Sequence, residues 1–556
     1  MSIISRRYSC ELLIKRACFA VFIACGNVAM AQGQVLVQPL SPVLGQLPEQ
    51  GKGQVPLSPP PPPQAWHIES YLGATVTATD NSALATAALL PEDMILEIAP
   101  RLVVSGRGAS FALDADVTGR ALLYAKSTQD NRLLPAGTVA LKANLVDKWI
   151  YLDAAVTADQ IVADPFAPRA DTGTGINKIN SLGYRLSPYL KHDFTPSLAF
   201  FARSDNYWTK RRADLAANDP RRDSLVQKQS ALLERKPVPF GFTAEASQET
   251  TTYRTGSQDT LLQIDSARAV ATYALDPTFV IGVVGGAEKV ESALASTSDQ
   301  IVGGRISWAP TQRTELKGSY EKRFFGNGGS LEWRHRSPFI GMSLSAAREP
   351  TAVGSSFVLS PALGAVPTLL DAIYTTRYPD PMTRAAIVSG VISGLGLPNA
   401  LGEPVEVFSS YAQLRDSVSA SIVFQGVRST VAARLYAIKL RPLNLADSPL
   451  TPALPLLSDN FQRGMSMDFN RKLTAVFSAN VSLGYADIEG LGDAAGQSTT
   501  NALIRVSLGQ NLSAKTALTY GARYQVDRFI LADRFGAISN GEVRERAAFI
   551  GIVHRF

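Results

Sequence analysis

The sequence predicts an all-β protein, a large antiparallel transmembrane β-barrel, from three observations. Apolar and polar side chains alternate along many segments, and short connections alternate with long ones between these segments. The 556-residue chain ends in an apolar segment with a terminal phenylalanine. Charged residues make up 18% of the chain, fewer than the roughly 25% of soluble domains. No apolar run of about 18 residues follows the N-terminal segment, so we expect no membrane-spanning helix.

The N-terminal segment has the features of a secretory signal peptide. An apolar core, Ala17 to Ala24, precedes a cleavage motif of small residues, Ala29-Met30-Ala31. We therefore predict a signal peptide over residues 1–31 that is cleaved after Ala31. The apolar core is too short for an N-terminal membrane anchor. The basic residues that precede the core are Arg6, Arg7, Lys15 and Arg16.

All the cysteines lie inside this segment, as Cys10, Cys18 and Cys25. The predicted mature chain therefore has none, which excludes disulfides, thiolate catalysis and cysteine-bound zinc. The segment carries four basic residues and Glu11, so +3 of the formal charge of +6 leaves with it. The remaining charge gives no reason to expect nucleic acid as a partner. A twin-arginine signal at Arg6-Arg7 and a lipoprotein site at Cys25 are the alternatives to ordinary export.

Residues 32–65 predict a proline-rich periplasmic linker. Five consecutive prolines, Pro59 to Pro63, stand near its end and favour an extended, stiff spacer. The linker is either a tether alone or a contact for a periplasmic partner. It is too short for a plug domain, which argues against an active TonB-type transporter. Residues 66–556 are then the barrel.

Within residues 66–556 the apolar pattern repeatedly has a period of two. In residues 109–120, Phe111 and Leu113 share one face, whereas Asp114 and Asp116 share the other. Successive side chains of a strand point to opposite faces, so each such segment predicts a strand with one apolar and one polar face. The same pattern recurs in residues 314–323, 330–336, 502–508 and 518–527.

The lengths of the strands and of their connections indicate a membrane barrel. Predicted strands of about 10 to 15 residues exceed the usual 5 to 6 and reach the 9 to 11 or so that cross a bilayer. Short periplasmic turns and long external loops predict about 22 strands, within a range of about 18 to 24. A soluble barrel with its faces reversed is the alternative. The short connections include residues 106–108, 146–148, 276–278 and 471–472, and the long ones include residues 159–177, 350–415 and 441–459.

The C-terminal strand supports the outer membrane as the location. Phe556 ends the chain and shares a face with Ile552 and Ile550. This arrangement resembles the C-terminal assembly signal that the outer-membrane insertion machinery reads. We therefore expect Phe556 to act as the assembly signal, and outer-membrane lipid and the insertion machinery to be partners.

One stretch in the longest loop predicts a short helix. Asp380-Pro381 suits an N-cap and a first helical position, and Met382 to Ser393 follows with apolar residues at helical spacing. Gly394, Gly396 and Pro398 then end it. The helix is either a decoration on the surface or a constriction that folds into the lumen.

The sequence lacks the patterns of an enzyme or of a cofactor-binding protein. Its histidines show no metal-ligand spacing, and we find no nucleotide-binding loop. Asp114 and Asp116 share a face as a glycosidase pair would, yet such spacing is far more often that of a solvated wall. We therefore predict no enzymatic activity, no cofactor and no metal. The four histidines are His67, His192, His335 and His554.

Two adjacent segments, Arg323 to Asn327 and Ser330 to Arg336, carry a family resemblance. The chain resembles the outer-membrane β-barrel proteins associated with PEP-CTERM/exosortase systems and exopolysaccharide loci. The resemblance implies a barrel in bacteria that make exopolysaccharide, and it transfers no functional residues. The C-terminus lacks a PEP-CTERM sorting signal. Supporting segments are residues 100–108, 149–154, 187–190 and 379–381.

These observations lead us to expect an outer-membrane channel or export component linked to exopolysaccharide, whose partners would be the polymer or its export proteins. The alternative is a structural or docking barrel with a closed lumen and no transport. The channel reading depends on polar faces with charges of both signs. The candidate pore-lining residues are Asp114, Asp116, Arg120, Glu315, Lys317, Glu321, Arg323, Glu332, Arg334, Arg336, Arg434, Arg505, Arg523 and Asp527.

Overall fold

The computed structural model describes residues 66–556 except 87–90, 163, 170–176, 213–222, 256–257, 293–295, 352–365, 381–382, 385–386, 389–390, 393–412, 444–458 and 533–537. The predicted signal peptide and linker lie outside the described residues. The described strands are β1 (Trp66–Thr79), β2 (Asp93–Arg107), β3 (Phe111–Tyr124), β4 (Arg132–Val146), β5 (Ile150–Val162), β6 (Lys178–Asp193), β7 (Leu198–Arg212), β8 (Asp223–Arg235), β9 (Phe240–Thr255), β10 (Gln258–Asp276), β11 (Phe279–Ser292), β12 (Ser296–Thr311), β13 (Thr314–Arg323), β14 (Gly326–Arg336), β15 (Ile340–Thr351), β16 (Gln413–Gln425), β17 (Ser429–Pro442), β18 (Asn460–Lys472), β19 (Phe477–Gly490), β20 (Ser498–Asn511), β21 (Thr516–Ala532) and β22 (Ile538–Arg555).

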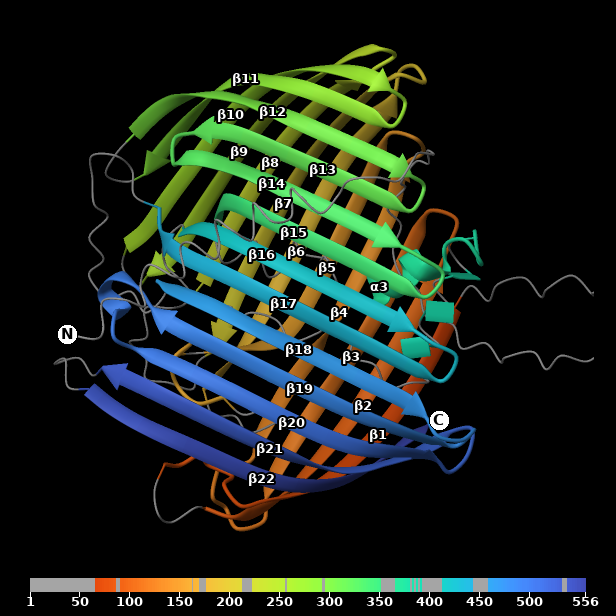
Figure 1. Cartoon of the computed structure of the whole chain (residues 1–556), viewed down its shortest axis with the longest axis vertical. Coiled ribbons are helices and arrows are strands. Elements are labelled where there is room, and N and C mark those ends of the chain that lie inside the picture. The colour runs from red at the N-terminus through yellow and green to blue at the C-terminus, as the bar shows by residue number, and fades with distance from the viewer. Residues whose placement is uncertain are drawn as a thin grey trace, which may run out of the picture.

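The strands form one closed antiparallel barrel (Figure 1). Each strand pairs with its neighbours in sequence, and β1 also pairs with β22, where Tyr71 lies opposite Arg555 and Thr79 opposite Ala547. The 22 described strands confirm the predicted fold class and the predicted strand number. Closure removes the free edges that an open sheet of this size would expose.

The two faces of the wall differ in polarity. On β22, Ile550 and Ile552 are 51% and 42% exposed, whereas Glu545 is 1% exposed on the opposite face. On β20, Val506 is 47% exposed, and Arg505 next to it points inward. An apolar outer surface around a polar interior is the arrangement of outer-membrane barrels. The soluble alternative needs the apolar side chains inside and does not fit.

The connections differ in length between the two ends of the barrel. Trp66 and Phe556 lie at one end, which we call the terminal end, and the opposite end is the loop end. The longest connection, residues 352–412, leaves from the loop end between β15 and β16. The predicted alternation is not uniform, because the loop-end connections 256–257 and 324–325 are as short as turns. The connections at the terminal end are all short, whereas the long ones gather at the loop end. That the terminal end faces the periplasm stays a prediction.

The longest connection returns into the lumen as helix α3 (Val366–Tyr374). Leu370 is fully buried in a cluster with Val423 of β16 and Ala432 of β17, two residues of the inner face near the terminal end. Figure 1 shows α3 at the same end of the barrel as the C-terminus. None of the helices among the described residues is long and apolar enough to cross a membrane.

The predicted loop helix also lies in the lumen. The Asp380 carboxylate accepts a hydrogen bond from the Thr383 backbone N–H at 2.7 Å, as an N-cap does. The described residues 383–384, 387–388 and 391–392 are helical. Val388 is fully buried in the cluster around α3, and Ile392 packs against it. The packing against Val423 and Ala432 fits the alternative in which the loop helix folds into the lumen and not the one in which it decorates the outer surface. That it constricts a pore stays a prediction, and α3 itself was not predicted.

Candidate functional site

The lumen wall of β2 and β3 is built from ion pairs between adjacent strands. Their side chains are between a quarter and a half exposed, so they face solvent in the lumen. Pairing holds each side chain against the wall instead of letting it reach across the lumen. The pairs are Asp114 with Arg107 at 2.8 Å, Asp116 with Arg101 at 2.6 Å, and Arg120 with Glu97 at 2.7 Å.

A second set of inward charges lies on β9 to β14. Glu321 contacts Arg268 at 3.2 Å and Arg305 at 3.5 Å, and Arg323 contacts Glu288 at 2.6 Å. The Glu288 side chain is fully buried and also accepts the backbone N–H of residue 324. The structure thus brings Glu321 and Arg323 into one charged band along this side of the wall. Two further pairs join residues two positions apart on the same strand, Glu315 with Lys317 and Glu332 with Arg334.

A third network, on β5 to β7, was not predicted. Arg203 donates to Asp153 at 2.9 Å and to Asp205 at 2.8 Å. Ser187 donates to Asp205, and Arg185 lies 3.6 Å from it. Residues 203–206 are polar in succession, so the local sequence does not mark which face of β7 points inward. Nothing in the sequence pairs Arg203 with Asp153, fifty positions earlier.

The connection between β5 and β6 folds inward at the loop end. Gln525 on the inner face of β21 donates to the backbone carbonyl of Arg169, and Phe166 is fully buried against Ile488 of β19. Burial of the Arg169 guanidinium holds its pKa below the ordinary value. Beneath this contact, Asp527 accepts hydrogen bonds from Gln525 and Asn501. The connection therefore reaches from β5 and β6 to the inner face of β19 and β21, on another part of the barrel wall.

At the terminal end, side-chain contacts tie the helical segment to itself and to the wall. Arg336 on β14 donates to Thr376 at 3.0 Å and to the Gln312 backbone carbonyl at 2.9 Å. Arg384 donates to Asp371 of α3 at 2.6 Å. We call α3, residues 375–380 and the described helical residues 383–392 the lumen segment. It lies against the inner wall at the terminal end, as the β5–β6 connection does at the loop end.

A pocket of about 530 Å³ hollows the inner wall where β1 to β3 meet β18 to β22. We call it the inner-wall pocket. Arg505 and Arg523 lie on β20 and β21 directly opposite each other, and Phe549 of β22 lies beside them. The pocket needs the β1–β22 closure, so no local sequence pattern could have located it. Its polar lining residues are Thr75, Thr77, Glu97, Arg120, Asp468, Asn470, Ser478, Asn480, Ser482, Arg505, Ser507, Thr519 and Arg523.

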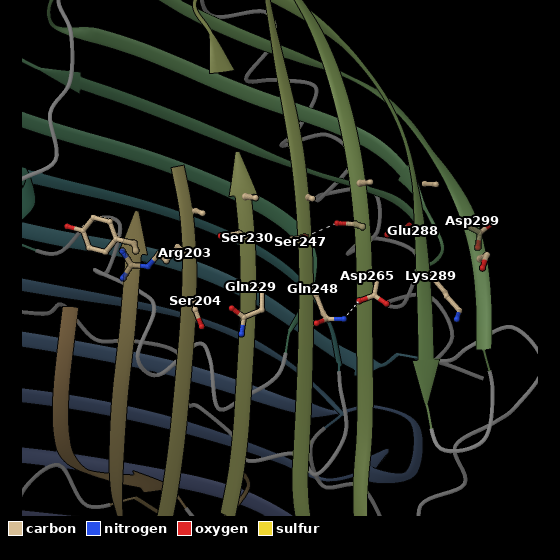
Figure 2. A pocket seen from close by; sticks show the side chains of 18 of the residues that line it. Arg203, Ser204, Gln229, Ser230, Ser247, Gln248, Asp265, Glu288, Lys289 and Asp299 are labelled. Carbon is tan, nitrogen blue, oxygen red and sulfur yellow. Dashed lines mark hydrogen bonds between the residues drawn. The ribbon is translucent and has the colours of Figure 1, made fainter. Parts of the chain in front are cut away.

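A larger pocket of about 1460 Å³ follows β5 to β13. Figure 2 shows Gln248 turned toward Asp265, with a hydrogen bond of 2.9 Å. Ser247 and Ser266 are bonded to each other at 2.8 Å from the neighbouring strand positions, which face the opposite side. The lining residues therefore lie on both faces of the wall, where several of the side chains are those of alanine. This pocket is not an enclosed chamber.

All the predicted pore-lining residues lie on inward-facing strand positions, including Arg434 of β17. That they line an open pore stays a prediction. Phe556 donates its backbone N–H to the Ser70 carbonyl at 3.0 Å and is 65% exposed beside His554. Its role in assembly also stays a prediction. Among the described residues, no group of three or more histidine or acidic side chains could hold a metal ion.

No family model matches the chain, and no curated protein sequence matches it either. Solved structures similar to it include the siderophore receptor PiuA from Acinetobacter baumannii, at 9% identity and a TM-score of 0.44 over 88% of this chain and 82% of that one. The ferric-catecholate import receptor Fiu from E. coli K12 has 10% identity and a TM-score of 0.44 over 88% and 82%. The FrpB iron transporter from Neisseria meningitidis has 8% identity and a TM-score of 0.46 over 89% and 81%. These similarities are too low to support any conclusion about cargo. The fold is established by the strand pairing of the chain itself.

Proposed function

We propose that the protein is an outer-membrane channel for hydrophilic molecules, whose lumen is gated by the lumen segment. The observation that carries the proposal is the packing of α3 on the inner wall, where Leu370 is buried against Val423 and Ala432. Elsewhere the inner wall presents paired charges of both signs, such as Arg101 of β2 with Asp116 of β3. Such a wall suits water and polar solutes, and a segment held by a small apolar cluster can be displaced without unfolding the barrel.

Single-channel conductance in planar bilayers tests this function. Leu370→Asp places a carboxylate in the apolar cluster, where burying a charge is costly, so α3 should leave the wall. We expect larger or more frequent openings than in the parent protein. Thr368→Asp is the matched control, because Thr368 is an exposed residue of the same helix, and it should conduct like the parent.

The second candidate is the docking barrel with a closed lumen. The inward folding of connections at both ends, at Phe166 and at Leu370, favours it. It predicts no conductance from the parent protein or from Leu370→Asp, although both insert as heat-modifiable barrels. That result would remove the channel proposal.

The cargo proposed for the channel is exopolysaccharide, and its support is the resemblance of the segments 323–327 and 330–336 to barrels from exopolysaccharide loci. The polymer or its export proteins would then be partners. Deleting the gene should lower the surface polysaccharide of the host, and the parent gene should restore it. Normal surface polysaccharide in the deletion strain would contradict this cargo while leaving the channel itself untouched.

A further inference from the structure

We propose that the inner-wall pocket is a binding site for a neutral saccharide unit. This inference rests on the proposed channel function and names a site on the path of its cargo. The pocket of about 530 Å³ falls within the roughly 300 to 1,000 Å³ typical of ligand sites.

Glycines at the pocket and beside it let neighbouring groups approach the wall closely. A Cβ atom at Gly551 would lie 2.5 Å from the Thr75 hydroxyl oxygen, and one at Gly521 would lie 2.8 Å from the Phe549 ring. The Phe549 ring therefore lies over the β21 backbone in space that a side chain at residue 521 would occupy. The two glycines therefore let Thr75 and Phe549 lie against the wall, and both of these side chains line the hollow.

The polar groups of the pocket suit a ligand with many hydroxyl groups. Ser507, Thr519 and Asn480 come from three adjacent strands, and hydroxyl and amide groups both donate and accept hydrogen bonds. Glu97 and Asp468 supply carboxylate oxygens on two sides of the hollow. A sugar presents hydroxyl groups around its ring that can use donors and acceptors together, and bonds from hydroxyls to charged groups are the stronger kind.

The charge balance of the pocket disfavours an anion. The Arg120 guanidinium donates two hydrogen bonds to the Glu97 carboxylate, at 2.8 and 2.7 Å, in a bidentate pair. The Arg523 guanidinium lies 2.7 Å from the Glu545 carboxylate. Asp468 adds a further carboxylate near Arg505. The arginines thus already face carboxylates, and an anion such as phosphate would have to compete with these for them.

The aromatic ring gives the site a surface for the apolar side of a sugar. The electron-rich face of an aromatic ring attracts the positive edges of C–H groups. Phe549 projects inward from β22, with the Arg505 guanidinium 6.0 Å from the ring centre. A sugar ring that rests on Phe549 places its hydroxyls within the band of Ser507 and Thr519. The combination of ring, hydroxyls and balanced charges is what selects a neutral saccharide.

Calorimetric titration of the purified barrel tests the site without any need for conduction. The protein is kept in a detergent without sugar headgroups and titrated with maltohexaose and with cellohexaose. We expect saturable binding of at least one of them. Ser507→Phe fills the hollow and should weaken this binding about tenfold or more, which corresponds to about 1.4 kcal/mol or more.

Leu508→Phe is the matched control, because the same ring then points to lipid from the next residue of β20. It should bind like the parent. Binding of neither sugar, equal binding by both variants, or displacement of the sugar by inorganic phosphate would each overturn the site. Failure of the channel proposal would show instead as absent conductance, a separate measurement.

Discussion

The guanidinium of Arg523 on β21 lies 2.7 Å from the carboxylate of Glu545 on β22, and each side chain is only 1% exposed. Thr79 of β1 donates a further hydrogen bond to Glu545 at 2.7 Å. This pair therefore joins three strands at the seam where the barrel closes. Removing one partner of a buried pair leaves an uncompensated charge, which costs more than the pair itself contributes.

Glu545→Gln should consequently lower the free energy of unfolding by about 3 to 5 kcal/mol. The measurement is the urea concentration at which the heat-modifiable band is lost on a gel. Glu542→Gln, which removes the partner of the exposed Arg528, is the control and should leave the midpoint unchanged, since exposed pairs contribute little. Equal midpoints for both variants would show that the buried pair does not stabilise the seam.

The division between the lipid face and the lumen face of β20 predicts opposite tolerances at adjacent residues. Val506→Arg should destabilise the barrel by about 2 to 4 kcal/mol if the residue lies near the bilayer midplane. Arg505→Ala should cost much less, because its side chain faces the lumen. Folding titrations into lipid vesicles measure both. The reverse ranking would mean that the two faces are assigned the wrong way round.

The close approach of α3 to β15 predicts a steric route to opening. A Cβ atom at Gly341 would lie 2.8 Å from the Leu369 carbonyl oxygen, so Gly341→Ala should displace α3 and raise the open probability of the channel. Ser343→Ala, two residues along the same inward face, is the control in the same bilayer recordings. A Gly341→Ala channel indistinguishable from the parent would contradict gating by the lumen segment.

The terminal residue predicts an assembly defect. Deleting Phe556 should slow insertion, because the signal expected for the insertion machinery is then missing, and an unfolded band should accumulate in pulse-chase experiments. Phe556→Tyr keeps an aromatic residue at the end and should assemble near the parent rate. Normal assembly of the deleted chain would place the signal elsewhere.

The faces of the strands could be predicted because a period of two is a local property of the sequence, as at Val506 and Arg505. The partners of charged residues could not. Arg323 contacts Glu288, which lies 35 positions away, and only the register of the strands between them brings the two together. The inner-wall pocket depends on barrel closure for the same reason.

Both helical segments have a recognisable sequence pattern, but only the pattern of the second one led to a prediction. Asp380 and Pro381 announce the second helical segment, and the Asp380 cap is confirmed. The sequence of α3 also has a helical pattern, with Pro367 in the first turn. Its apolar residues have the spacing of one helix face: Val366, Leu369, Leu370 and Ile373. The position of both segments inside the lumen depends on apolar contacts with Val423 of β16 and Ala432 of β17, which follow them in sequence. No local pattern shows that the connection turns back to meet these two strands.

The pairing of β1 with β22 sets a condition on biogenesis. Thr79 and Glu545 are bonded across 466 residues of sequence, so the seam cannot form until the last strand has been synthesised. Until then both edge strands carry unpaired backbone groups that invite aggregation, and contacts so distant in sequence form slowly. The unfinished chain must therefore be protected from aggregation over its whole length. Its final strand both completes the sheet and bears the expected assembly signal.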